Sequence, residues 1–402
     1  IDPQPSKAVL VKGATVFSNY MWKKEGFYIV DGAIRYNIAR VAEDTIHLED
    51  KYVVPGFADG HTHNLDRPWQ KYLINQYLSE GTLYIQNLTS KSKGVRQFRP
   101  VLEEQKTLKV SYANWGFTST LGHPFPAYEP YAMGLRDASK WSELADSIRK
   151  SRLDLFNSYA FVDSVSQLDS IWPKYLETSP DLTKVYYFNE EGISDKIMGA
   201  HGLRLDVAKA IIDSAHTAGF KVYAHVEDRH DFEKMIKAGV DGFAHMPGYG
   251  WDGNPSTFEK YFLPDSLLRE AAKRGVVINP TAALASLSLE GTELDKVADF
   301  QFDLIRRYRE MHGNLIVGSD VFGSTASKVF EYYVKQFPLS ENSLLSLIST
   351  ETSMQIFPDT AVGQIRDGYK ADFLVFDQKP IAGKRIKKPE NVFVGGKLVL
   401  EK

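Results

Sequence analysis

Short runs of alternating hydrophobic and polar residues stand at both ends of the chain. Near the N-terminus they cover residues 9–11, 14–17, 27–30 and 34–36, and Asp31-Gly32 separates the last two runs. Both residues of an Asp-Gly pair tolerate a positive φ, so this pair predicts a hairpin. The same alternation returns in residues 372–376 and 391–400. We therefore predict one composite β-sandwich domain that is built from residues 7–54 and 359–402.

Between these ends, short apolar segments alternate with amphipathic segments. The helix predicted at residues 203–217 carries apolar residues at helical spacing: Leu205, Ala208, Ile211, Ile212 and Ala215. The strands predicted in the middle of the chain are residues 84–88, 182–187, 220–225, 242–245, 276–279 and 315–320. Repeated strand-helix units form either an open doubly wound sheet or a closed barrel.

The placement of polar residues favours the barrel. No Gly-x-Gly-x-x-Gly follows an early strand and no phosphate-binding loop is present, which argues against a nucleotide-binding open sheet. Polar side chains instead follow or end the predicted strands, where parallel barrels build their active sites: His61, His63, Lys184, His225, His245 and Asp320. We expect an α/β protein whose residues 55–358 form a (β/α)8 TIM barrel.

The first of these positions, His61-Thr62-His63, ends an apolar run that begins at Val53. Residues i and i+2 of a strand point to the same side, so both imidazoles would face one point in space, which suits a metal ion. Taken singly, the other positions have simpler explanations. Lys184 could be a surface lysine, His225 and His245 could be core histidines with satisfied hydrogen bonds, and Asp320 could cap a helix. All six together favour a metal centre.

The amino-acid composition excludes some kinds of site chemistry and gives no support to some kinds of binding partner. The 402 residues include no cysteine, so disulfides, thiolate ligands and a cysteine nucleophile are excluded. A net charge of −3 gives no reason to expect nucleic acid or an anionic membrane surface as a partner, and no apolar run reaches the roughly 18 to 20 residues of a membrane span. The first six residues lack a methionine and look like a processed or constructed end, a weak indication of export. The sequence leaves the compartment and a homo-oligomeric state open.

The order His-x-His, Lys, His, His, Asp resembles the amidohydrolase superfamily, specifically its binuclear-metal branch. The segments that carry this resemblance are residues 55–63, 219–225, 238–245, 317–320 and 363–375. Within the superfamily, Thr183-Lys184-Val185 and Gly122-His123 are similar to the imidazolonepropionase-like and prolidase-like (Xaa-Pro dipeptidase-like) members.

The donor types suit two divalent metal ions, most simply zinc. His61, His63 and Asp320 would hold one ion, and His225 and His245 the second. The resemblance implies that Lys184 is carboxylated and that its carbamate bridges the two ions. A hydroxide shared by the metals would then be the nucleophile, with Asp320 as catalytic base and later acid. This chemistry hydrolyses an amide or peptide-type C–N bond in a small substrate such as a dipeptide, an N-acyl amino acid or a cyclic amide.

His123 is the candidate for orienting the substrate, and Tyr249, in the aromatic- and glycine-containing loop 246–253, for lining the pocket. Residues 244–247 and 349–354 differ from the usual sequence of the family at these places, so the resemblance does not identify the substrate. One alternative is a mononuclear deaminase or imidazolone-type hydrolase, in which Lys184 is incidental and Glu227 or Glu190 shuttles protons. A catalytically dead binding protein is another alternative, and the intact ligand set argues against it.

Overall fold

Strands from the N-terminal region form a small sheet of their own. The structure is a computed structural model that describes residues 7–39, 41–188 and 201–401. The sheet has the strand order β5-β4-β1-β6, made of β1 (Ala8–Lys12), β4 (Phe27–Val30), β5 (Ala33–Arg35) and β6 (Asp44–His47). Asp31 has a φ of 52°, as the Asp31-Gly32 hairpin between β4 and β5 requires. The predicted hairpin is confirmed.

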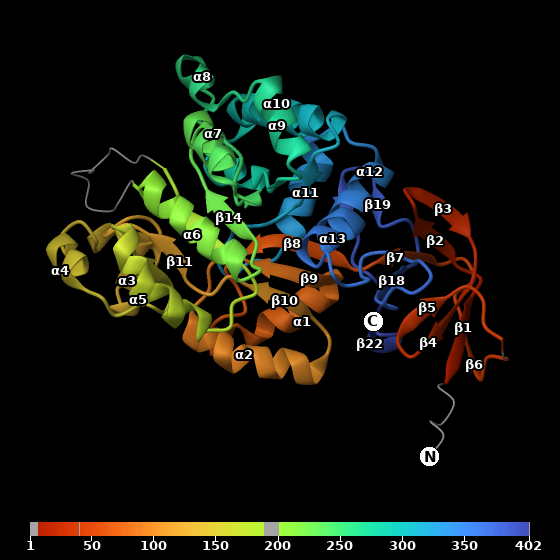
Figure 1. Cartoon of the computed structure of the whole chain (residues 1–402). Helices are drawn as coiled ribbons and strands as arrows, with labels where there is room; N and C mark the ends of the chain where they lie inside the picture. Colours follow the sequence, from red (N-terminus) through yellow and green to blue (C-terminus); the bar gives the residue numbers. More distant parts are fainter. Residues whose placement is uncertain (1–6, 40, 189–200, 402) are drawn as a thin grey trace.

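A second sheet combines both ends of the chain (Figure 1). Its order is β22-β21-β18-β7-β2-β3, made of β2 (Thr15–Ser18), β3 (Met21–Lys24), β7 (Tyr52–Pro55), β18 (Phe373–Phe376), β21 (Asn391–Val394) and β22 (Lys397–Glu401). The antiparallel pair β7 and β18 sets Pro55 opposite Phe373, so segments more than 300 residues apart share one ladder. Buried side chains from both sheets, including Val11, Phe27 and Phe393, form one apolar cluster.

Parallel strands make up the middle of the molecule, which confirms a mixed α/β protein with a parallel sheet. One sheet has the order β10-β9-β8, from β8 (Phe57–Thr62), β9 (Thr82–Asn87) and β10 (Lys109–Tyr112). The other has the order β12-β11-β13-β14-β15-β16-β17, from β11 (Gly116–Thr118), β12 (Tyr159–Phe161), β13 (Thr183–Tyr186), β14 (Val222–His225), β15 (Gly242–Phe243), β16 (Val277–Ile278) and β17 (Asn314–Leu315).

Main-chain hydrogen bonds connect both edges of the three-stranded sheet to the seven-stranded sheet. The Gly60 N–H donates to Val317 O and the Asp320 N–H donates to His61 O, each over 2.7 Å, so β8 lies beside the segment that follows β17. At the other edge the Asp181 N–H donates to Tyr112 O over 2.8 Å, which ties β10 to the approach to β13. The carboxyl ends of the first and last parallel strands are therefore neighbours.

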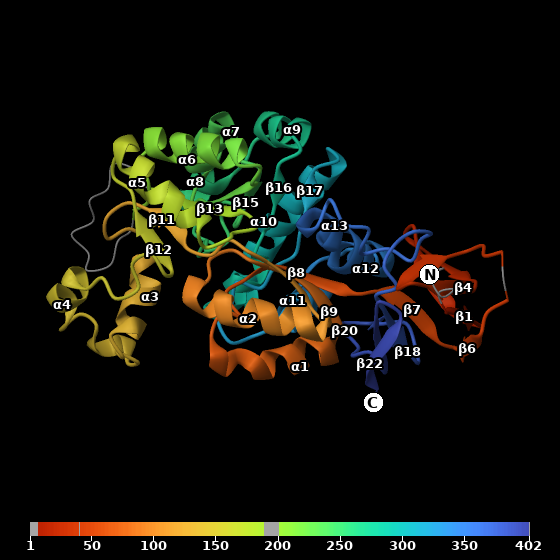
Figure 2. The ribbon, with the colours of Figure 1, turned by 60° about the horizontal axis from the view of Figure 1, so that its bottom comes forward.

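Helices cover the outside of the parallel strands (Figure 2). The longer ones are α1 (Lys71–Glu80), α2 (Ser92–Gln105), α5 (Val165–Leu176), α6 (Leu205–Thr217), α7 (Arg229–Ala238), α9 (Asp265–Lys273), α10 (Gly291–Glu310) and α11 (Ser327–Gln336). Helix α6 confirms the helix predicted at 203–217, and it buries Ala208, Ile211 and Ile212. Shorter helices are α3 (Phe125–Ala132), α4 (Ala145–Lys150), α8 (Phe258–Tyr261), α12 (Glu341–Ser346) and α13 (Thr352–Ile356).

The predicted strands are confirmed, with shorter ladders than expected. Strands β15, β16 and β17 have two residues each, so His245 and Asp320 lie just beyond the strands that lead to them. Several strands were not predicted: β3, β6, β10, β11, β12 and the small antiparallel pair β19 (Ile381–Ala382) and β20 (Arg385–Ile386). Their apolar runs are too short to stand out from the surrounding sequence.

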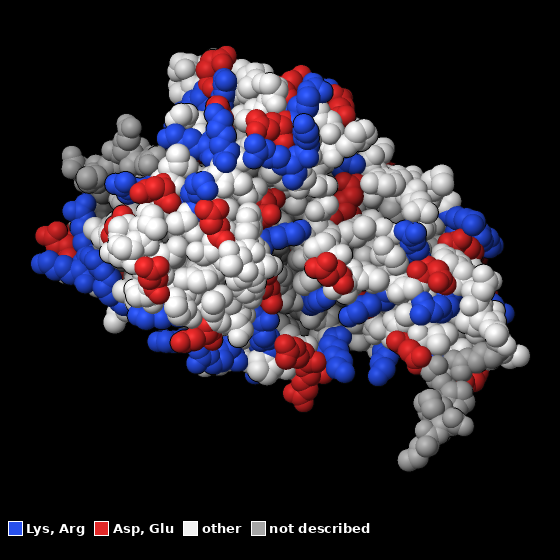
Figure 3. Space-filling view, viewed as in Figure 1, with Lys and Arg blue, Asp and Glu red and all other residues white. Residues whose placement is uncertain are grey.

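The surface carries charges of both signs. Lysine and arginine side chains are interspersed with aspartate and glutamate over the face seen in Figure 3. Among the helices of residues 7–39, 41–188 and 201–401, none combines the length and apolar character needed to cross a membrane.

Candidate metal centre

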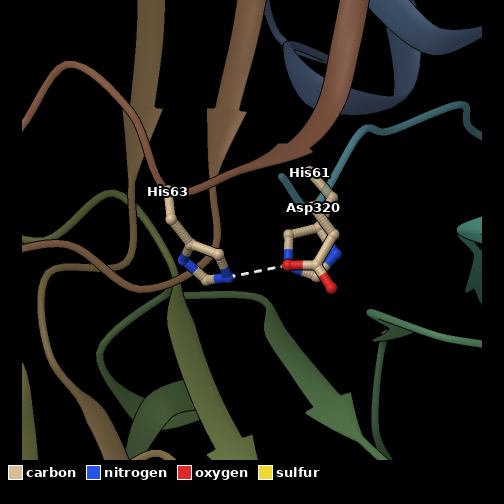
Figure 4. Close-up of side chains that lie close together, drawn as sticks. All are labelled: His61, His63 and Asp320. Carbon is tan, nitrogen blue, oxygen red and sulfur yellow. Dashed lines mark ion pairs between the residues drawn. The ribbon is translucent and has the colours of Figure 1, made fainter. Parts of the chain in front are cut away.

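His61, His63 and Asp320 converge on one point (Figure 4). Their candidate ligand atoms all lie within 4.8 Å of one another. The His63 Nε2 atom is 2.9 Å from Asp320 Oδ1, and the His61 Nε2 atom is 3.3 Å from the same oxygen. The structure thus brings together residues that are more than 250 positions apart, because β8 lies beside the segment after β17.

His245 approaches Asp320 from another side. Its Nε2 atom lies 3.7 Å from Asp320 Oδ2, and its ring centroid is 5.0 Å from that of His61. Three imidazoles therefore point their Nε2 atoms at a single carboxylate.

The opposite ring nitrogens define the tautomers of these histidines. The His61 Nδ1 atom lies 3.0 Å from Ala244 O and the His63 Nδ1 atom 2.9 Å from Thr89 O. A carbonyl oxygen only accepts, so each Nδ1 carries the hydrogen and each neutral ring keeps a lone pair on Nε2.

His245 is held in the same way by a side chain. The Thr281 hydroxyl donates to Pro280 O over 2.9 Å, so its oxygen is free to accept from His245 Nδ1, which is also 2.9 Å away. The Nε2 atom of His245 is then unprotonated as well.

Lone pairs that face a carboxylate oxygen repel it unless a positive charge lies between them. Consistent with this, His61 Nε2 is buried and has no hydrogen-bond partner within the described part of the chain, although Asp320 is close. Imidazole nitrogens and carboxylate oxygens are ordinary zinc ligands, and backbone or hydroxyl groups commonly hold the second nitrogen of a metal-binding histidine. The residues present therefore fit a divalent metal ion.

Electrostatics at the site follow from burial and from this crowding. Burial alone would raise the pKa of the Asp320 carboxyl, but the neighbouring His61, His63 and His245 hold that pKa well below its ordinary value. Burial also lowers the pKa of His61 and of His245 well below the usual range for histidine. These shifts favour neutral His61 and His245 rings beside an ionised Asp320 carboxylate.

Lys184 lies in β13 and is 1% exposed. Its Nζ atom lies 5.2 Å from the ring centroid of Tyr186, and among the described residues no hydrogen bond or ion pair reaches it. Burial lowers the pKa of its ammonium group to about 7. Lys184 is therefore not the surface lysine that its residue type would suggest.

His225 ends β14 beside His245, with ring centroids 4.6 Å apart. Its Nε2 atom lies 2.9 Å from Glu227 Oε1, while its Nδ1 atom is buried and lacks a partner among the described residues. His225 is thus next to the His61, His63 and Asp320 group but not a member of it.

The two predicted substrate residues border the same cluster. The ring of His123 stacks on His225 at 5.0 Å, and the ring of Tyr249 stacks on His245 at 4.3 Å. The Tyr249 hydroxyl donates to Glu227 Oε1 over 2.9 Å. Trp251, from the same loop as Tyr249, instead packs against Phe300. Glu190 lies outside the described residues.

Several residues around the site were not identified from the sequence. Asp59 accepts hydrogen bonds from the Ser319 N–H and hydroxyl, and Phe322 stacks on His63 with ring centroids 5.0 Å apart. Thr89 and Thr281 follow β9 and β16, so the strand-end rule that selected the ligands also applies to them. Asp59 precedes His61 by two residues and shares its strand face, which is a second usable signal.

Comparison with known proteins gives structural matches only. No protein-family model matches the sequence, and no curated protein matches it at a significant level. Solved structures match nearly the whole chain. An ochratoxinase from A. niger has a TM-score of 0.73 at 14% identity, with 99% of this chain and 97% of the other covered.

Two further structures match equally broadly. A prolidase complexed with N-methylphosphonate-L-proline has a TM-score of 0.71 at 17% identity, covering 98% of this chain and 100% of the other. Phenylurea hydrolase B has a TM-score of 0.70 at 12% identity, covering 98% of this chain and 97% of the other. The structural neighbours of this chain are amidohydrolase-like and prolidase-like proteins, and the chain has their fold.

Proposed function

We propose that this protein is a metal-dependent amidohydrolase that cleaves an amide or peptide-type C–N bond in a small substrate. The observation that carries the proposal is the convergence of the Nε2 atoms of His61, His63 and His245 on the Asp320 carboxylate. The shared fold supports it, since structures with this fold are described as ochratoxinase, prolidase and phenylurea hydrolase.

The proposal includes a domain organisation. The two parallel sheets, hydrogen-bonded to each other at β8 and at β10, would be one (β/α)8 barrel in residues 55–358, with β10 and β11 as halves of one strand and β12 as an additional strand beside β11. Residues 7–54 and 359–402 would form the composite β-sandwich domain, supported by the sheet that contains β7 and β18. In such a barrel the active site lies at the carboxyl ends of the strands, where His63 and Asp320 are found.

We further propose two metal ions, most simply zinc. His61, His63 and Asp320 would hold one, and His225 and His245 the other. Lys184, as a carbamate, would be a ligand of both ions. The carbamate would form when the neutral amine of Lys184 attacks carbon dioxide, which makes a C–N bond and releases one proton. The burial of Lys184 and its lack of a partner among the described residues support this role.

The chain's own groups would orient the substrate and move the proton. Bound metal ions would supply an acidified water molecule and polarise the scissile carbonyl. An Oδ atom of Asp320 would accept the proton of the attacking water and later donate it to the leaving nitrogen. His123 and Tyr249, on the rings of His225 and His245, would position the substrate.

Metal content tests this proposal. Protein purified without chelators should carry two ions per chain, and Lys184→Ala should carry markedly less, because the bridging ligand is gone. Lys221→Ala, which removes an exposed lysine just before β14, is the matched control and should keep two ions. Dipeptides, N-acyl amino acids and cyclic amides would be screened in parallel. Absence of bound metal in the parent protein, or absence of any C–N hydrolysis after metal loading, would contradict the assignment.

One observation favours a second candidate, a mononuclear deaminase or imidazolone-type hydrolase. The His225 Nε2 atom contacts Glu227 rather than the His61, His63 and Asp320 group. Glu227 would then shuttle protons beside a single ion. One ion per chain in the parent and in Lys184→Ala would support this candidate and direct the screen to amino-heterocycles and imidazolones.

A further inference from the structure

We propose that Arg67 binds a carboxylate of the substrate, so that the preferred substrates carry a free carboxylate near the scissile amide. This inference rests on the proposed function and specifies its substrate class. Arg67 follows His63 by four residues and ends the loop after β8, directly before the 3-10 turn Pro68–Gln70 that leads into α1.

Arg67 contacts the two aromatic rings that border His63. Its Cζ atom lies 5.4 Å from the ring centroid of Phe322 and 5.9 Å from that of Tyr128. The Phe322 ring stacks on His63 at 5.0 Å, and the Tyr128 hydroxyl lies 3.3 Å from His63 Nδ1. The guanidinium group and the His63 ring therefore contact the same two aromatic side chains.

The hydrogen-bonding capacity of this guanidinium is unused in the described part of the chain. Its side chain is 17% exposed, and its one ion pair there is a long one, 3.7 Å from Nε to Asp66 Oδ1. Guanidinium groups carry five N–H donors, and a desolvated one without acceptors is costly. A ligand that brings two acceptor oxygens would satisfy it.

Beside the rings of Tyr128 and Phe322, Arg67 is the cation without a short ion pair among the described residues. Lys91, the other cation near Tyr128, pairs with Asp154 over 2.7 Å. The Asp66 Oδ2 atom accepts from the Lys91 N–H over 2.7 Å, and its buried Oδ1 atom, 3.7 Å from Arg67 Nε, has no hydrogen-bond partner among the described residues. Phe322 is 46% exposed, so a ligand can reach this region from solvent.

The shape of the donor indicates the class of ligand. A planar guanidinium binds a carboxylate through two parallel hydrogen bonds, and aromatic faces on the same wall accept an apolar side chain. An N-acyl amino acid or a dipeptide offers a carboxylate, an apolar side chain and an amide within a few bonds. A cyclic amide without a carboxylate does not.

The first test measures binding to the metal-free protein and does not depend on turnover. N-acetyl-L-phenylalanine and its carboxamide would be titrated into the parent, Arg67→Met, Arg67→Lys and Arg136→Met. Arg136 is the matched control, an exposed arginine 5.7 Å from the ring of Tyr131. The acid should bind the parent at least roughly tenfold more tightly than the amide, the value of one charge-assisted hydrogen bond. Arg67→Met should lose this preference, Arg67→Lys should keep part of it and Arg136→Met all of it.

The second test uses metal-loaded protein and pairs of N-acyl amino acids with their carboxamides. Arg67→Met should lower kcat/KM by roughly 10- to 100-fold for the acids and by less than about threefold for the amides. Equal binding of acid and amide by the parent, no binding of the acid, or an acid preference that survives in Arg67→Met would overturn the role of Arg67. If the acid preference depends on Arg67 but no C–N bond is cleaved, the carboxylate site stands and the proposed function fails.

Discussion

The backbone at Asp320 argues against the simpler explanation of this residue as a helix cap. Helix α11 begins at Ser327, so Asp320 does not cap it. Asp320 instead has a φ of 49°, in the left-handed region, and its N–H is bonded to His61 O. Non-glycine residues in that region cost free energy and concentrate at functional sites. The backbone around Asp320 serves to direct its carboxylate at the histidines.

At the same scale, Thr281 has a positioning role for His245. Thr281→Val keeps the shape and removes the oxygen that holds His245 Nδ1. We expect metal affinity to fall by roughly 10- to 100-fold, the usual effect of losing such a partner. Competition with a chromogenic chelator measures this affinity.

Thr292→Val is the matched control, since the exposed Thr292 hydroxyl bonds only to Glu293 in the described structure. Its metal affinity should equal that of the parent. An unchanged affinity in Thr281→Val would show that His245 is oriented without this hydroxyl, or that it is not a ligand.

At the scale of elements, the site depends on the close approach of β8 and the segment after β17. Gly318 lies where this approach is tightest. A Cβ atom at Gly318 would collide with the main-chain nitrogen of His61 and with the side chain of Asn279. The absence of a side chain at Gly318 lets the two backbone segments approach closely enough for the Asp320 N–H to donate to His61 O.

Gly318→Ala should therefore disturb both stability and metal binding. Overpacking of this kind costs about 1–3 kcal/mol of unfolding free energy. The measurement is urea denaturation, combined with metal content per chain. Gly250→Ala is the control, because a Cβ at Gly250 meets open space. Equal stability and equal metal content in the two variants would contradict the proposed geometry.

At the scale of the whole molecule, the terminal strands and the parallel strands share one hydrophobic core. Phe17, Val54, Leu374 and Val392 belong to the same buried cluster as the residues of the parallel sheets. A Cβ at Gly81, at the end of α1, would collide with Leu374, so this leucine fills the space between the two regions. The molecule should unfold as one unit.

Leu374→Ala tests this coupling. Truncating a fully buried leucine lowers the free energy of unfolding by roughly 2–5 kcal/mol. The single denaturation transition should therefore move to a lower urea concentration. Circular dichroism and metal release should report the same midpoint. Leu398→Ala, in the same sheet and 46% exposed, should change stability by less than about 0.5 kcal/mol. Separate transitions for secondary structure and metal release would contradict a shared core.

The sequence by itself determined most of the strands, helix α6 and the candidate ligands. Periodicity of apolar residues reports which face of a strand or helix is buried, so the strands, helix α6 and the Asp31-Gly32 hairpin were predictable. The six strand-end positions were identifiable because parallel strands present their carboxyl ends at one edge.

Only the tertiary structure decided how these pieces meet. The sequence predicted that both chain ends share a β domain and that His61 and Asp320 share an ion. The register of β7 against β18 and the distance from His61 to Asp320 come only from the structure, because they join residues more than 250 positions apart. The same holds for the tautomers set by Ala244, Thr89 and Thr281, and for the aromatic rings that place Arg67 beside His63. Side-chain geometry depends on the packing of distant segments, and that packing exists only in the folded chain.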